Sequence, residues 1–123
     1  YAEALNYNGD KTNALKYLNI IHQRAGYPAI LATDPSVATT EGLEDVILQE
    51  RQYELFGEGK RWFDLVRTDR VNKVMDPVIN YRSKRIDASS TATWGSDLNK
   101  ILWPVYRQNL EDNPALVQNP SYF

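Results

Sequence analysis

Apolar residues recur at helical spacing near the start of the chain. Over residues 11–24 they return every three or four positions, which predicts an amphipathic helix with one buried face. Asp10 is expected to be its N-cap. A shorter helix is expected over residues 2–7, and Asn8 and Gly9 predict a tight turn between the two helices. Together the two segments predict one antiparallel hairpin of the tetratricopeptide type.

The rest of the chain is also predicted to be helical, with long irregular parts. One helix is expected over 41–56, with Thr40 as its N-cap, and another over 60–68. Pro77 is expected to interrupt the helical pattern that follows. Residues 83–99 have no periodicity and are rich in Ser, Thr and Ala, which predicts a surface loop. The Pro and Asn residues near the C-terminus predict an irregular tail that wraps the body. The fold class is therefore mostly α, with helix pairs and long loops.

The most informative segment is LQERQYELFGEGKRWFDLVR, from Leu48 to Arg67. Charged residues are interleaved here with large apolar ones, and Gly57 and Gly59 break the helical pattern. Charges that are buried among apolar groups must be paired, because an unpaired buried charge costs several kcal/mol. The segment therefore predicts two helices that meet at a packed corner.

This segment resembles the signature of SusD/RagB-like proteins, which is roughly ER-x-x-E-L-x-G-E-G-x-R-W-x-D-L-x-R. The tail from Leu102 to Phe123 is similar to the closing segment of that family, with its matching residues between Asn113 and Tyr122. The hairpin over 2–26 is similar to the helix pair that precedes the signature. Ser121 departs from the pattern, since glycine is usual there. The matching signature residues are Glu50, Arg51, Glu54, Leu55, Gly57, Glu58, Gly59, Arg61, Trp62, Asp64, Leu65 and Arg67.

The resemblance implies a function as well as a fold. It implies a cell-surface protein of the outer membrane that binds glycans or oligosaccharides and delivers them to a TonB-dependent, SusC-like transporter. It also implies a lipid anchor at the N-terminus, which these 123 residues do not contain. In family members with known glycan sites, most contacts come from upstream of this region. Residues 1–123 are therefore expected to be the C-terminal region of a longer protein, with a mainly structural role.

Composition agrees with this expectation and excludes several other classes. The helix over 2–7 starts without a capping residue, which suggests a chain cut from a longer one. The net charge of −2 does not favour nucleic acid as a partner. No apolar run approaches the ~20 residues of a membrane-spanning helix. The chain has no cysteine and one histidine, so neither a disulfide nor a zinc site is expected.

The charged residues of the signature allow two interpretations. Two carboxylates on one helix face, such as Glu50 and Glu54, could serve a glycosidase or a hard metal ion. The alternation of sign instead predicts a structural ion-pair network, in which nearby arginines donate forked hydrogen bonds to the acids. We favour the network and expect no enzyme activity, no cofactor and no metal. Its members are Glu50, Arg51, Glu54, Arg61, Asp64 and Arg67.

Trp94 is the candidate ligand contact, because it lies within the polar loop over 83–99. A tryptophan in a loop either inserts into the core or offers its face to a sugar or partner. His22 lies beside the buried stripe of its helix and is expected to be structural. An alternative for the whole chain is a protein-interaction module built on helix hairpins, although only one hairpin is evident.

Overall fold

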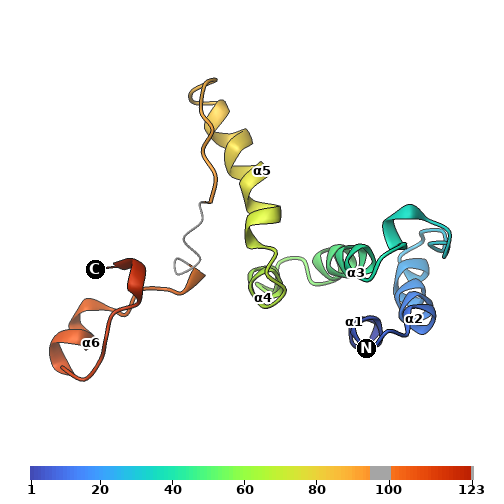
Figure 1. Ribbon diagram of the computed structural model, residues 1–123, viewed down its shortest axis with the longest axis horizontal. Coiled ribbons are helices and arrows are strands. Elements are labelled where there is room, and N and C mark those ends of the chain that lie inside the picture. Colours follow the sequence, from blue (N-terminus) through green and yellow to red (C-terminus); the bar gives the residue numbers. More distant parts are fainter. Residues whose placement is uncertain (95–100, 123) are drawn as a thin grey trace. The chain divides into compact units, whose positions relative to one another are not determined.

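The computed structural model describes residues 1–94 and 101–122 of the chain, and within them every regular element is a helix (Figure 1). The mostly α class is therefore confirmed. The prediction of helices over residues 2–7 and 11–24 is also confirmed, and both have the expected bounds. The α-helices are α1 (Ala2–Tyr7), α2 (Lys11–Arg24), α3 (Thr40–Glu54), α4 (Arg61–Arg67), α5 (Val71–Lys84) and α6 (Arg107–Asp112), with short 3₁₀ helices η1 (Pro35–Val37) and η3 (Pro120–Tyr122).

The chain forms two compact units, Tyr1–Asp64 and Leu65–Phe123, and α4 begins in the first and ends in the second. In the first unit, α1 packs against α2, and both contact α3. The core of this unit is small and aliphatic, and partly buried apolar residues of α1 and α3 pack around it. Its buried members are Ala14, Leu15, Leu18, Val37, Leu43 and Ile47.

Local capping explains where the helices of the first unit begin. The Asp10 side chain accepts a hydrogen bond from the backbone N–H of Asn13 at 3.1 Å, so its predicted N-cap role is confirmed. A hydrogen bond from the Asn13 side chain, and then this backbone bond, lower the pKa of Asp10. The expectation for Thr40 is wrong by one residue. Thr39 is the N-cap of α3, and its hydroxyl accepts from the Gly42 N–H at 2.9 Å.

Gly42 of α3 lies against the backbone of Ser36 in η1. A Cβ at this position would fall inside van der Waals contact with the backbone carbonyl oxygen of Ser36. Alanine normally stabilises a helix by about 1 kcal/mol relative to glycine. We expect Gly42→Ala to have the opposite effect and to lower the free energy of unfolding by about 1–3 kcal/mol, as overpacking does.

Urea denaturation followed by circular dichroism checks this expectation, with Gln49→Ala at an exposed position of α3 as the control. The control is expected to change the free energy of unfolding by less than about 0.5 kcal/mol. A Gly42→Ala variant as stable as the parent protein would show that η1 can move away without cost.

In the second unit, α5 continues through Pro77, so the predicted interruption is wrong. A proline inside a helix removes one backbone hydrogen bond and crowds the carbonyl four residues earlier, which weakens a helix without necessarily ending it. Pro77 is exposed, and the helix runs on from Val71 to Lys84 around it. The loop that was predicted over 83–99 therefore begins only after Lys84, and its residues 95–99 lie outside the described part. Farther on, the Gln118 side chain accepts from the Val105 N–H at 2.8 Å and donates to the Val105 carbonyl at 3.0 Å. Both residues belong to the irregular tail, so this reciprocal pair closes a loop within it.

Across the described ranges 1–94 and 101–122, we find no helix with both the length and the apolar character that crossing a bilayer requires.

Candidate functional site

The signature segment forms a corner between α3 and α4. Gly57 and Gly59 have φ angles of 81° and 70°, a region that favours glycine over every other residue. The chain can therefore turn sharply after Glu54 and begin α4 at Arg61. The corner folds the first turn of α4 back towards α3, and this brings distant charges of the segment together.

A bidentate ion pair joins the two helices of the corner. The Arg51 guanidinium donates from Nε to Asp64 Oδ2 at 2.9 Å and from Nη2 to Asp64 Oδ1 at 3.0 Å. The Asp64 side chain is only 4% exposed, whereas that of Arg51 is 38% exposed. Two parallel hydrogen bonds to a buried carboxylate fix the orientation of both partners. This pair is therefore a structural tie between α3 and α4.

Arg61 adds a second tie across the same corner. Its guanidinium donates to the backbone carbonyl of Leu48 at 2.8 Å. Burial lowers the pKa of Arg61, and the nearby Asp64 carboxylate acts in the opposite direction. Arg67, the remaining arginine of the expected network, is exposed at the end of α4.

Glu50 and Glu54 contact α2 instead of the arginines that were expected to pair with them. Glu50 is buried, and its Oε2 lies 2.8 Å from Nδ1 of His22. The Arg24 guanidinium donates to Glu54 Oε2. His22 also stacks on the ring of Tyr27, with the ring centroids 5.1 Å apart.

Sequence reasoning missed these partners because residues 28 and 30 positions apart are brought together only by the packing of α2 on α3. Within residues 1–94 and 101–122, the acids and histidines do not form a cluster of three that could hold a metal ion. Glu50 and Glu54 each have a cationic or imidazole partner from α2. The arrangement therefore resembles a salt-bridged scaffold more than a pair of catalytic carboxylates.

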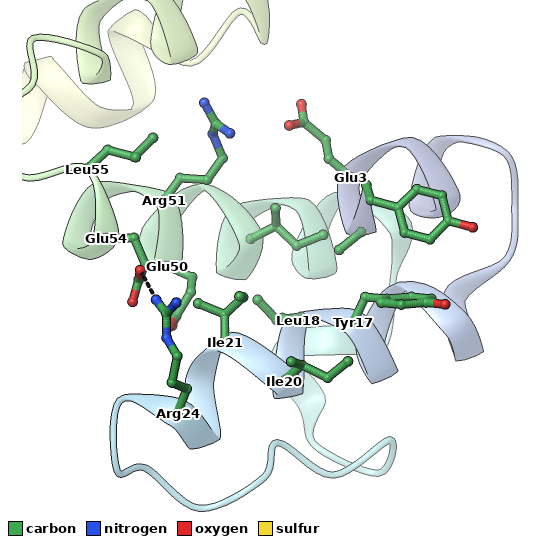
Figure 2. A pocket seen from close by; sticks show the side chains of 13 residues that line it. Glu3, Tyr17, Leu18, Ile20, Ile21, Arg24, Glu50, Arg51, Glu54 and Leu55 are labelled. Carbon is green, nitrogen blue, oxygen red and sulfur yellow. Dashed lines mark hydrogen bonds and ion pairs between the residues drawn. The ribbon is translucent and has the colours of Figure 1, made fainter.

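A groove of about 440 Å³ lies beside these pairs in the first unit. In Figure 2, Leu18 and Ile21 extend from α2 towards α3, and Arg24 reaches Glu54 at one end of the groove. Its volume is within the range of 300–1,000 Å³ that is usual for ligand pockets. Apolar side chains form the larger part of its lining, and the charged residues that line it are Glu3, Arg24, Glu50, Arg51 and Glu54.

Trp94 lies in the second unit, where the described part of the loop ends. Its backbone N–H donates to Asp76 Oδ1 of α5 at 2.6 Å. The side chain is partly buried, and its indole nitrogen is shielded from solvent. The shielded nitrogen favours an anchoring role, although the residue as a whole is only partly buried.

Three comparisons with known proteins agree with one another. The family model described as "SusD family" matches residues 1–122. SusD-like protein P38 from Formosa agariphila is 38% identical over 125 residues, which cover 98% of this chain and 22% of that protein. The crystal structure of a SusD superfamily protein from Bacteroides thetaiotaomicron matches with a TM-score of 0.69 and 31% identity, over 99% of this chain and 24% of that one. This chain therefore spans about a quarter of the length of these two relatives, and it belongs to the SusD family.

Proposed function

We propose that this chain is the C-terminal region of a lipid-anchored protein on the cell surface that binds glycans or oligosaccharides. The family match over residues 1–122 is the observation that carries the proposal. SusD-family proteins are outer-membrane lipoproteins of the cell surface, and they bind their ligands without catalysis. The proposed partner is a SusC-like TonB-dependent transporter, which receives the bound nutrient.

Within such a protein, we assign residues 1–123 a mainly structural role. The ties Arg51–Asp64 and Arg61–Leu48 hold the corner, and the pairs His22–Glu50 and Arg24–Glu54 hold α2 on α3. These contacts use the charged groups of the signature for packing. The tail, within which Gln118 bonds to Val105, would close the fold.

The test is to express the full protein encoded by the gene and to measure its binding to neutral and acidic polysaccharides by affinity gel electrophoresis. We expect retardation on at least one polysaccharide, and we expect a tagged form to copurify with a TonB-dependent transporter from native membranes. A protein that binds no polysaccharide and copurifies with soluble protein partners would contradict the proposal. That result would favour the helix-hairpin interaction module instead.

Trp94 is the ligand contact that we propose from the sequence, and replacing it separates its two possible roles. Because the residue is partly buried and its indole nitrogen is shielded from solvent, we expect Trp94→Ala to lower the melting temperature by several degrees, while the backbone bond to Asp76 is kept. The exposed Trp103→Ala is the matched control, because Trp103 is 82% exposed. Unchanged stability together with lost polysaccharide affinity would assign Trp94 to the ligand and not to the core.

A further inference from the structure

The C-terminal half of α5 carries a stripe of exposed side chains. Val78, Tyr81, Arg82 and Arg85 are all exposed and lie at positions i, i+3, i+4 and i+7. Arg85 is the C-cap and keeps helical φ and ψ angles, so it continues the stripe by one residue beyond the helix. Tyr81 is 67% exposed. This α5 stripe therefore combines an open aromatic ring with two guanidinium groups, and the exposed Lys84 lies beside it.

The cations at this end of α5 have no carboxylate to neutralise them. Within residues 1–94 and 101–122, the side chains of Arg82, Lys84 and Arg85 make no ion pair. No acid occupies the positions three or four residues before any of them. Asp87 is the nearest acid along the chain, and its Oδ1 accepts hydrogen bonds from the N–H and the hydroxyl of Ser89. Its carboxylate therefore serves the turn that follows the helix.

The helix terminus explains part of this positive charge but not its arrangement. The helix macrodipole favours cations in the last turn of a helix, which is where these residues lie. However, Arg82 and Arg85 are three residues apart on one stripe, and like charges at this spacing repel each other. The exposed Arg107 of α6, by contrast, has Glu111 four residues later as its partner. The end of α5 therefore keeps a local excess of positive charge that a bound anion would relieve.

The side chains of the α5 stripe match the chemistry of a negatively charged sugar. A guanidinium presents a planar fork of donors that suits the paired oxygens of a carboxylate or a similar anion. An exposed tyrosine presents a ring face on which an apolar surface can pack, together with a polar tip. Tyr81 and Arg85 are four residues apart, so the ring and one fork lie next to each other on the helix. A neutral sugar would use only the ring, whereas an acidic sugar would use both groups.

We propose that the α5 stripe is a contact site for an anionic polysaccharide, one whose sugars carry carboxylate or sulfate groups. This inference rests on the proposed function, because it narrows the class of glycan that the same protein binds. The backbone of Trp94 is bonded to Asp76 of the same helix. Five residues of helix separate Asp76 from Tyr81, which is about 7.5 Å of axial rise, so one polysaccharide chain is long enough to contact both regions.

Pairs of polysaccharides that share a backbone and differ in charge test the proposal. Dextran is compared with dextran sulfate, and methyl-esterified pectin with de-esterified pectin. The full protein encoded by the gene is used, and its affinity for each polymer is measured by affinity gel electrophoresis. We expect the parent protein to bind the charged member of at least one pair at least ~10-fold more tightly than the uncharged member.

Two double variants locate that preference on the protein. Arg82→Gln/Arg85→Gln removes both forks and is expected to weaken binding to the charged polymer at least ~10-fold. Lys16→Gln/Lys60→Gln is the matched control, because it removes the same net charge from exposed positions elsewhere. The control is expected to weaken binding less than ~2-fold. Tyr81→Ala is also expected to weaken binding, whereas Tyr81→Phe keeps the ring and is expected to restore it.

Equal losses in the two double variants would overturn the proposal, because total charge alone would then explain the binding. A parent protein that binds both members of each pair equally would also overturn it, but would leave the proposed glycan-binding function intact. A parent protein that binds no polysaccharide would contradict both.

Vesicles of phosphatidylcholine with phosphatidylglycerol distinguish a lipid surface from a glycan. If Arg82→Gln/Arg85→Gln lost binding to these vesicles and kept its affinity for every polysaccharide, the stripe would contact lipid, which contradicts the proposal. Circular dichroism confirms that each variant is folded. If the double variant does not fold, Arg85→Gln at the C-cap position gives the same readout.

Discussion

Leu43→Ala is expected to lower the free energy of unfolding by about 2–5 kcal/mol, the range that such a cavity-forming change causes in a packed core. Leu43 is 1% exposed and is one of the largest fully buried side chains in the described part of the chain. It belongs to the cluster that joins α2, η1 and α3, so the cavity would weaken the packing of α3 against both α2 and η1. Urea denaturation followed by circular dichroism measures the loss.

Leu31→Ala is the matched control for that change. Leu31 has the same side chain but is 66% exposed, so its truncation is expected to alter the free energy of unfolding by less than about 0.5 kcal/mol. Similar losses for the two variants would mean that Leu43 is not part of a close-packed core.

Asp64→Ala is expected to lower the free energy of unfolding by about 2–4 kcal/mol, which is the second large effect. The change leaves the Arg51 guanidinium without the carboxylate to which it makes two hydrogen bonds. Breaking a fully buried pair typically costs 3–5 kcal/mol. We expect a smaller loss because the Arg51 side chain is 38% exposed, and water can partly solvate its charge.

The exposed pair Arg107–Glu111 is the control for burial. Its nitrogen–oxygen distance of 2.9 Å equals the shortest distance in the Arg51–Asp64 pair, but its side chains are 90% and 51% exposed. Glu111→Ala is therefore expected to change stability by less than about 0.5 kcal/mol. If Asp64→Ala cost no more than Glu111→Ala, the corner would not be held by its ion pair.

The local parts of this fold could be predicted from the sequence. The bounds of α2 follow from its apolar spacing and from the Asp10 side chain, which caps the helix through a bond spanning only three residues. The break at Gly57 and Gly59 was also predictable, because glycine adopts positive φ more readily than other residues. Both glycines have positive φ in the structure. In each case the determining interaction lies within a few residues of the feature that it controls.

The nonlocal parts could not be predicted in the same way. The sequence places several arginines near Glu50 and Glu54, and proximity along the chain suggested those arginines as partners. The structure instead brings in His22 and Arg24, because packing of the α2 core stripe on α3 sets which side chains meet. The groove was missed for a related reason. The spacing of apolar residues shows that α2 has an apolar face. Only the packing of the helices shows which part of that face stays open.

The most direct test of the central claim is polysaccharide binding by the full protein in which Glu50 and Glu54 are both replaced by Gln. We expect the folded variant to keep the affinity of the parent protein for its polysaccharide, with a lower melting temperature, because these carboxylates hold α2 on α3 and perform no chemistry. A folded variant that has lost its affinity, or a parent protein that cleaves the polysaccharide where the variant does not, would contradict the claim that the corner is structural.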